Sequence, residues 1–240
     1  MTKYIIKDLS AVFGYLPYGV AGGVLAFVVL SLLNSLRCKK GKRLFSVPAG
    51  TLFFMYIVIM LFITFLSRES GSRVGVDMEL FSTWGINKRN NAYVLENIML
   101  FVPYGFLGAC TLLTARNFFP CLFLGLFTSV EIEYMQMVTK RGFFQIDDIL
   151  TNTLGAVIGY FIFMMIFGRK AREKEGNLHW SVRVFQIPTI LLLIAIMLYL
   201  IAVTGICPTD AEGWLKPLDA LAWREVHFFP DGTPGLERYR

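Results

Sequence analysis

Residues 130–159 read V-E-I-E-Y-M-Q-M-V-T-K-R-G-F-F-Q-I-D-D-I-L-T-N-T-L-G-A-V-I-G. This stretch places ionisable side chains between two almost wholly apolar segments, residues 120–128 and 156–167. Carboxylates in membrane-like surroundings are costly and normally face a protein interior or a wet cavity. The stretch therefore predicts a hairpin of two membrane helices with a charged cluster at its tip.

The first helix of this hairpin carries two polar residues on one face. At about 100° per residue, Glu133 and Gln136 lie together three positions apart, whereas Glu131 points elsewhere. Arg141 falls in the short connection between the helices, where it can pair with the carboxylates that flank it, Glu133, Asp147 and Asp148. A binding or catalytic cluster and simple interhelical glue both remain possible, because polar side chains also join membrane helices.

The second helix carries a stripe that changes character along its length. Its members are Asp148, Asn152, Gly155 and Gly159, at positions i, i+4, i+7 and i+11. The stripe is polar at its start and has glycines further in, and small residues let membrane helices approach closely. We expect another helix to pack against it.

The composition indicates an integral membrane protein. Of the 240 residues, 55% are hydrophobic and only 17% are charged, against about 25% charged in globular proteins. The formal net charge is +6, but the basic residues stand in short blocks between apolar spans, which argues against nucleic acid as a partner. The predicted fold is all-α: one polytopic membrane domain over residues 1–240, built as a helical bundle.

About six transmembrane helices are expected, at residues 13–36, 45–66, 97–115, 120–138, 146–167 and 184–206. Residues 67–96 are predicted to form a loop, with an interfacial element at W-G-I-N, residues 84–87. The tail, residues 207–240, is too polar to span a membrane.

The basic blocks at residues 37–43 and 169–174 predict the orientation. If both are cytoplasmic, the N- and C-termini are extracytoplasmic, and the polar ends of three spans meet at the outer face. The candidate binding residues gathered there are Asn97, Gln136, Arg141, Asp147, Asp148 and Asn152, and the catalytic candidates are Glu133, Asp148 and Arg141.

With these residues, the chain resembles the VanZ-like family of bacterial membrane proteins. The matching pieces are N-I-M-L-F-V-P-Y-G (97–105), S-V-E-I-E-Y-M-Q (129–136) and R-G-F-F-Q-I-D-D-I-L-T-N-T-L-G-A-V-I-G (141–159). The resemblance covers about residues 97–167, and it departs at Gln145, where family members commonly carry an acidic residue. Beside the polar positions, it selects residues expected to serve in packing: Phe101, Pro103, Gly105, Gly155 and Gly159.

The resemblance implies a multi-pass protein of the bacterial cytoplasmic membrane, and the family's founding member is linked with low-level resistance to the glycopeptide teicoplanin. One hypothesis is a non-enzymatic envelope factor that binds a lipid-linked cell-wall precursor or the drug. The alternative is a membrane enzyme acting on a lipid-linked substrate, with Glu133 or Asp148 as acid or base and Arg141 binding phosphate. A proton- or cation-coupled transporter is disfavoured, because the polar groups trace no path across the bilayer.

Metals and cofactors are not expected. The only histidines, His179 and His227, lie outside the hairpin, and the four cysteines show no paired spacing. The sequence has no H-E-x-x-H and no glycine-rich phosphate loop. Membrane lipids are the expected general partners.

Overall fold

The computed structural model describes residues 2–37, 46–66, 75–85, 88–173 and 180–204, and in these it has six α-helices. They are α1 (Thr2–Arg37), α2 (Val47–Leu61), α3 (Lys88–Thr111), α4 (Phe118–Val138), α5 (Ile146–Glu173) and α6 (Trp180–Thr204). The predicted all-α bundle is confirmed. The predictions for the tail, residues 207–240, and for the basic block between the first two spans concern residues that, except Arg37, lie outside this description.

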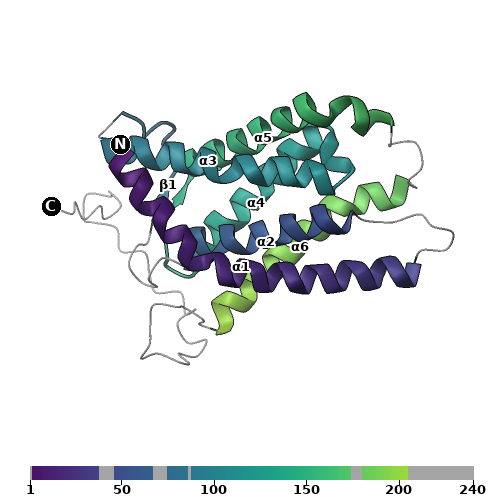
Figure 1. Ribbon diagram of the computed structural model, residues 1–240. Helices are drawn as coiled ribbons and strands as arrows, with labels where there is room; N and C mark the ends of the chain where they lie inside the picture. Colours follow the sequence, from purple (N-terminus) through teal and green to yellow (C-terminus); the bar gives the residue numbers. More distant parts are fainter. Residues whose placement is uncertain (1, 38–45, 67–74, 86–87, 174–179, 205–240) are drawn as a thin grey trace.

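Three short elements complete the fold. A π-helical turn, η1 (Phe62–Leu66), extends α2, and a 3₁₀ turn, η2 (Thr114–Arg116), joins α3 to α4. The strands β1 (Val76–Asp77) and β2 (Phe144–Gln145) pair in parallel. They lie at the end of the bundle where α1 begins (Figure 1).

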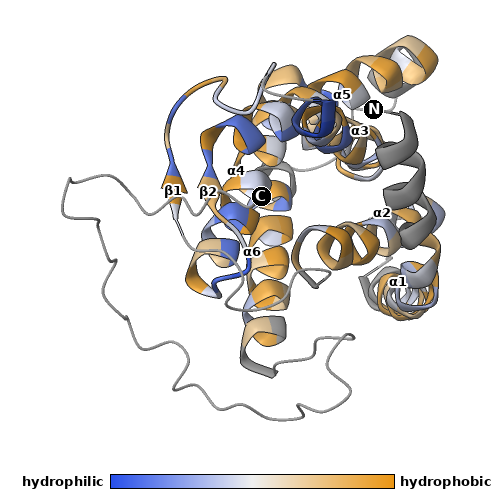
Figure 2. Cartoon of the chain, turned by 90° about the vertical axis from the view of Figure 1, so that its left-hand side faces the viewer, coloured by the Kyte–Doolittle hydropathy of each residue, from blue (hydrophilic) through white to orange (hydrophobic). Residues whose placement is uncertain are grey.

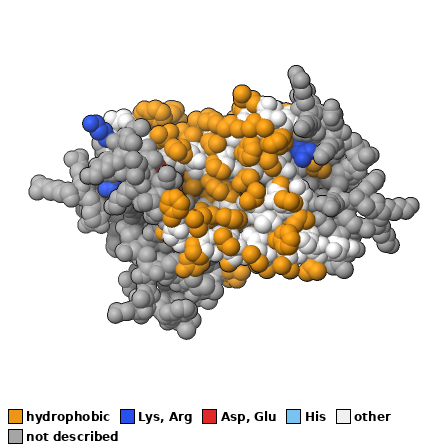
Figure 3. All heavy atoms as spheres, viewed as in Figure 1, with side chains coloured by type: hydrophobic (Ala, Val, Ile, Leu, Met, Phe, Trp, Pro, Cys, Tyr) orange, Lys and Arg blue, Asp and Glu red, His pale blue; other side chains and the backbone are white. Residues whose placement is uncertain are grey.

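The helices have the length and surface that a bilayer requires. Five segments are long and apolar enough to cross: Phe13–Leu32, Val47–Phe65, Lys88–Thr111, Phe118–Val138 and Ile146–Gly168. In α6 the described apolar stretch is shorter, Phe185–Leu200. Hydrophobic side chains form a broad band across the face seen in Figure 3, with lysine and arginine side chains on either side of it.

Two helices begin earlier than the spans predicted from hydropathy. The first begins at Thr2, ahead of the predicted span 13–36, and α3 begins at Lys88, so residues 88–96 are helical and not part of a loop. Hydropathy marks only the part of a helix that lies in hydrocarbon, whereas helical hydrogen bonds continue into the headgroup region. Ala92 and Val94 are buried, which shows that this first part of α3 also packs on the protein.

Glycines bring α3 and α5 into backbone contact. A Cβ added to Gly159 would collide with the carbonyl oxygen of Val102, and one added to Gly105 would lie 2.8 Å from the Cα of Ala156. A Cβ on Gly155 would likewise meet a backbone carbonyl of α3. The glycine part of the stripe on α5 therefore packs directly on α3.

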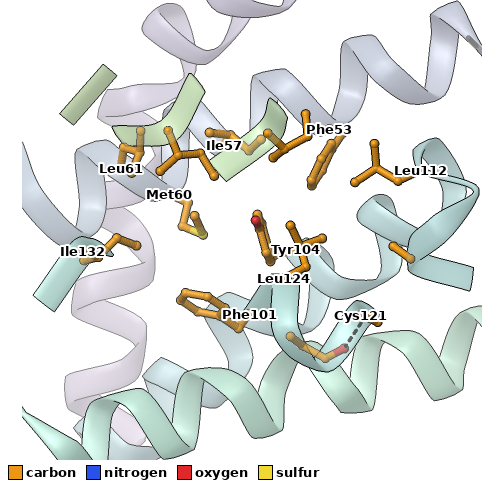
Figure 4. Packing of buried hydrophobic residues seen from close by; sticks show 14 of the residues in the cluster. Phe53, Ile57, Met60, Leu61, Phe101, Tyr104, Leu112, Cys121, Leu124 and Ile132 are labelled. Carbon is orange, nitrogen blue, oxygen red and sulfur yellow. Dashed lines mark hydrogen bonds between the residues drawn. The ribbon is translucent and has the colours of Figure 1, made fainter. Parts of the chain in front are cut away.

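The apolar core lies between α2, α3, α4, α5 and α6. Phe53 and Phe101 place their rings 5.4 Å from the ring of Tyr104, and all three are fully buried (Figure 4). The hydroxyls of Tyr104 and Thr128 share a hydrogen bond of 2.7 Å, which satisfies two buried polar groups in the core.

Candidate functional site

Polar side chains from three helices and one connection gather at the end of the bundle that carries β1 and β2. Figure 2, which faces this end, shows hydrophilic residues on otherwise largely hydrophobic helices. We call this set the polar cluster; its members are Asn97, Glu133, Gln136, Arg141, Asp147, Asp148 and Asn152. Five are buried, and Asn97 and Asp148 are half-buried.

The two cluster residues of α4 each bind a different neighbour. Glu133 is 2% exposed, and its Oε2 accepts the backbone N–H of Gln145 in β2 at 3.1 Å. Gln136 is 1% exposed, and its Nε2 donates to the carbonyl of Thr64 at 2.8 Å. These bonds tie α4 to the strand on one side and to the π-helical turn on the other.

The connection after α4 turns Arg141 back into the protein. The backbone N–H groups of Arg141 and Gly142 donate to the carbonyl of Gln136, at 2.8 and 3.3 Å. Lys140 makes the turn possible by adopting a φ of 57°, in the left-handed region. The guanidinium of Arg141 lies 5.2 Å from the centre of the Phe65 ring, a cation–π arrangement.

The polar part of the stripe on α5 is shared between two helices. Asn97 of α3 donates from Nδ2 to Oδ1 of Asp148 at 2.7 Å. Asn152, one turn further along, instead donates from Nδ2 to the hydroxyl of Ser129 on α4 at 2.9 Å. The Oδ1 of Asn152 is buried and has no hydrogen-bond partner within the described residues.

Asp147 holds the loop that precedes α3. Its carboxylate accepts the backbone N–H of Phe81 at 2.6 Å and that of Thr83 at 3.0 Å, and the Ser82 hydroxyl lies at 3.5 Å. Phe81 has a φ of 63°, which is uncommon for a residue of its size, so these bonds fix a strained turn. The Asp147 carboxylate is thus directed at the loop.

Asp77 supports the same loop from inside. Its Oδ2 accepts the Ser82 hydroxyl at 2.8 Å, and its Oδ1 accepts the backbone N–H of Glu79 at 3.0 Å. The backbone N–H of Phe144 donates to the carbonyl of Gly75 at 3.0 Å, next to the parallel pair β1–β2. Loop 75–85 is therefore joined to the hairpin connection at its start and to α5, through Asp147, at Phe81 and Thr83.

Other residues that hydrogen-bond to the polar cluster were not selected from the sequence. Ser129 lies four positions before Glu133 and so shares its helix face, a signal that the spacing contained. Thr64 contributes only a backbone carbonyl, and loop 75–85 has no periodic pattern, so neither was detectable. Glu131, expected to point away from the cluster, is half-buried, and its Oε2 has no hydrogen-bond partner within the described residues.

The described part of the chain contains no group of three or more His, Cys, Asp and Glu placed to hold a metal ion. The donors and acceptors of the polar cluster instead bind one another and the nearby backbone. The cluster can therefore hold its helices in a defined arrangement and present polar groups at the end of the bundle.

The bundle has several helices that can cross a membrane, and a buried polar cluster lies at one of its ends. These features define a polytopic membrane protein with a polar site at one end. Residues 52–167 match the family model described as VanZ/LLP1, so this part of the chain is VanZ-like, and the resemblance seen in its motifs is confirmed. No curated protein and no solved structure matches the chain.

The match begins at residue 52, upstream of the motif-based segment 97–167, and includes most of α2 with η1. The structure supplies a reason for this longer unit. Phe65 and the carbonyl of Thr64, both in η1, contact Arg141 and Gln136 of the polar cluster.

Proposed function

We propose that this protein is a non-enzymatic envelope factor of the bacterial cytoplasmic membrane. Its polar cluster forms the frame of an extracytoplasmic binding site, and it contributes to glycopeptide (teicoplanin-type) resistance or a related envelope function. The VanZ/LLP1 match supports the biological setting. The observation that carries the binding role is that the acidic side chains of the cluster hydrogen-bond to neighbouring elements of the protein and are held in place by these bonds.

The acids of the cluster bind the protein's own donors. Glu133 accepts a strand N–H, Asp148 accepts the Asn97 amide, and Asp147 accepts N–H groups of the loop. A general acid or base must reach a proton on the substrate, within about 2.6–3.2 Å. Carboxylates that hold neighbouring elements in place favour a rigid binding frame over acid–base chemistry.

The candidate ligands are a lipid-linked cell-wall precursor and the glycopeptide drug. Both present amide and hydroxyl donors, and the buried Oδ1 of Asn152 offers an open acceptor. Arg141 supplies a permanent positive charge, which suits a phosphate of a lipid-linked precursor.

Isosteric substitutions separate binding from catalysis. We expect Glu133→Gln and Asp148→Asn to retain most of the resistance that the wild-type chain confers on a susceptible Gram-positive host, measured as the teicoplanin inhibitory concentration. The new amides still offer a carbonyl oxygen to the Gln145 N–H and to Asn97. Glu133→Leu and Asp148→Leu remove the acceptor and should lose resistance. Each donor left unsatisfied lowers the stability of the folded protein by about 1–3 kcal/mol.

The outcome is read at equal amounts of folded protein in the membrane. Isosteres that abolish resistance as fully as the leucine variants would favour the alternative, an enzyme using Glu133 or Asp148 as acid or base. A wild-type chain that leaves teicoplanin susceptibility unchanged would contradict the resistance role.

Cysteine labelling tests the proposed orientation, with the polar cluster and both termini outside the cell. Lys140→Cys and Arg172→Cys are made singly after replacing the four native cysteines with alanine. A membrane-impermeant maleimide applied to intact cells should label position 140 and spare position 172. Labelling at 172 and not at 140 would invert the molecule and exclude an extracytoplasmic site.

A further inference from the structure

A groove lies along the contact between α3 and α5, on the side covered by loop 75–85. Its cavity volume is about 120 Å³. Since roughly 10–15 Å³ holds one water molecule, the groove can take a segment of a larger ligand. Six apolar side chains line it: Phe81, Trp84, Val94, Ile98, Leu150 and Leu154.

The two polar residues of the lining use their polar atoms elsewhere. The carboxylate of Asp147 accepts the N–H groups of Phe81 and Thr83, and the Thr151 hydroxyl donates to the carbonyl of Asp147 at 2.9 Å. The groove therefore offers little to a water molecule or a polar ligand, and apolar cavities of this kind stay dry.

The groove opens sideways from the bundle. Leu150 and Leu154 are 44% and 50% exposed, and Phe81 and Trp84 at its rim are 69% and 62% exposed. Both α3 and α5 are among the segments able to cross a membrane, so in a bilayer this face would lie against hydrocarbon. Trp84 at the rim suits the headgroup boundary, where tryptophan is enriched.

Two exposed cations stand beyond the rim. Lys88 and Arg89 begin α3, six and five positions before Val94, which places them about 8–9 Å further along the helix axis. The Nε of Arg89 donates to the Tyr93 hydroxyl at 2.8 Å, so Lys88 is the cation considered for the groove. A lipid phosphate at that level would lie at the headgroup end of a hydrocarbon chain held between Val94 and Leu154. Basic side chains at this depth attract anionic lipids.

We propose that this groove is a binding site for a phospholipid of the surrounding bilayer with an anionic headgroup. One hydrocarbon chain lies between α3 and α5 under Phe81 and Trp84, and the phosphate lies beside Lys88. The groove shares Asp147 with the polar cluster, but its apolar lining lies outside that cluster, so the proposal does not depend on what the cluster binds.

Trp84 is a built-in reporter of this lipid. The full chain, with Trp180, Trp214 and Trp223 replaced by phenylalanine, is reconstituted in phosphatidylcholine vesicles containing brominated phosphatidylglycerol or brominated phosphatidylcholine. We expect phosphatidylglycerol to quench Trp84 at lower mole fractions, with an enrichment of about five-fold, the effect of one basic side chain near the surface. Equal quenching by the two lipids would overturn the proposal.

A matched pair of variants tests the place of binding. Thr151→Phe fills the groove and should abolish the excess quenching, whereas Ile162→Phe, on the exposed face of α5 outside the groove, should preserve it. Native mass spectrometry of the chain with its own tryptophans gives a second readout. Bound phospholipid should accompany the parent and Ile162→Phe but not Thr151→Phe, and its retention in Thr151→Phe would contradict the assignment.

Discussion

Replacing Gly159 with leucine is expected to separate α3 from α5 and to destabilise the folded protein by about 3 kcal/mol or more. The first carbon of the new side chain would collide with the carbonyl oxygen of Val102 and lie 2.7 Å from the backbone nitrogen of Phe106. Backbone atoms of a helix cannot turn aside as a flexible side chain can. Gly159→Ala should therefore also destabilise, because it adds the same Cβ.

Gly14→Leu is the control, because a Cβ at Gly14 has nothing within 4 Å. Thermal unfolding in detergent, with size-exclusion chromatography to confirm a folded starting state, measures the difference. Gly14→Leu should unfold at the wild-type temperature and Gly159→Leu far below it, or not fold at all. Equal midpoints for the two leucine variants would show that α3 and α5 do not pack as described.

Replacing Asp147 with alanine is expected to release loop 75–85 from the bundle. The substitution removes the acceptor of two backbone N–H groups, those of Phe81 and Thr83, and hydrogen bonds to charged groups are worth about 1.5–3 kcal/mol each. Without them, the strained backbone of Phe81 loses the two bonds that tie it to α5. The loop, and with it the rim of the lipid groove, should become dynamic while the helices stay folded.

Hydrogen exchange of the peptides that cover residues 75–85 measures this release. We expect faster exchange in Asp147→Ala, an intermediate rate in Asp147→Asn, which keeps one acceptor oxygen, and unchanged exchange in α4. Glu79→Ala removes an exposed carboxylate from the same loop and serves as control. If Asp147→Ala exchanges no faster than Glu79→Ala, Asp147 does not hold the loop.

The membrane helices were predictable because hydrocarbon leaves the backbone few choices. A chain segment in lipid must satisfy its own N–H and C=O groups, so a long apolar run predicts a helix from composition alone. The start of α3 was not predictable in this way, because residues 88–96 are polar and lie outside the apolar run. Their helical state depends on continuing α3 and on burying Ala92 and Val94 against the protein.

Side-chain spacing predicted faces, and the tertiary structure decided their partners. The period of the helix places Asp148 and Asn152 on one stripe of α5. Nothing in that spacing says that the first would bind Asn97 of α3 and the second Ser129 of α4. The stripe lies where three helices meet, and only their packing determines which neighbour each amide or carboxylate reaches.

By itself, the sequence determined that this chain is a helical membrane protein with a VanZ-like segment, because hydropathy and helical period are local properties. Only the tertiary structure decided the contacts between distant segments. The bond from Phe81 to Asp147 joins residues 66 positions apart, and that from Gln136 to Thr64 joins residues 72 apart. In each bond one partner is a backbone group that every residue carries, so the sequence marks the side chain but not the residue that it binds.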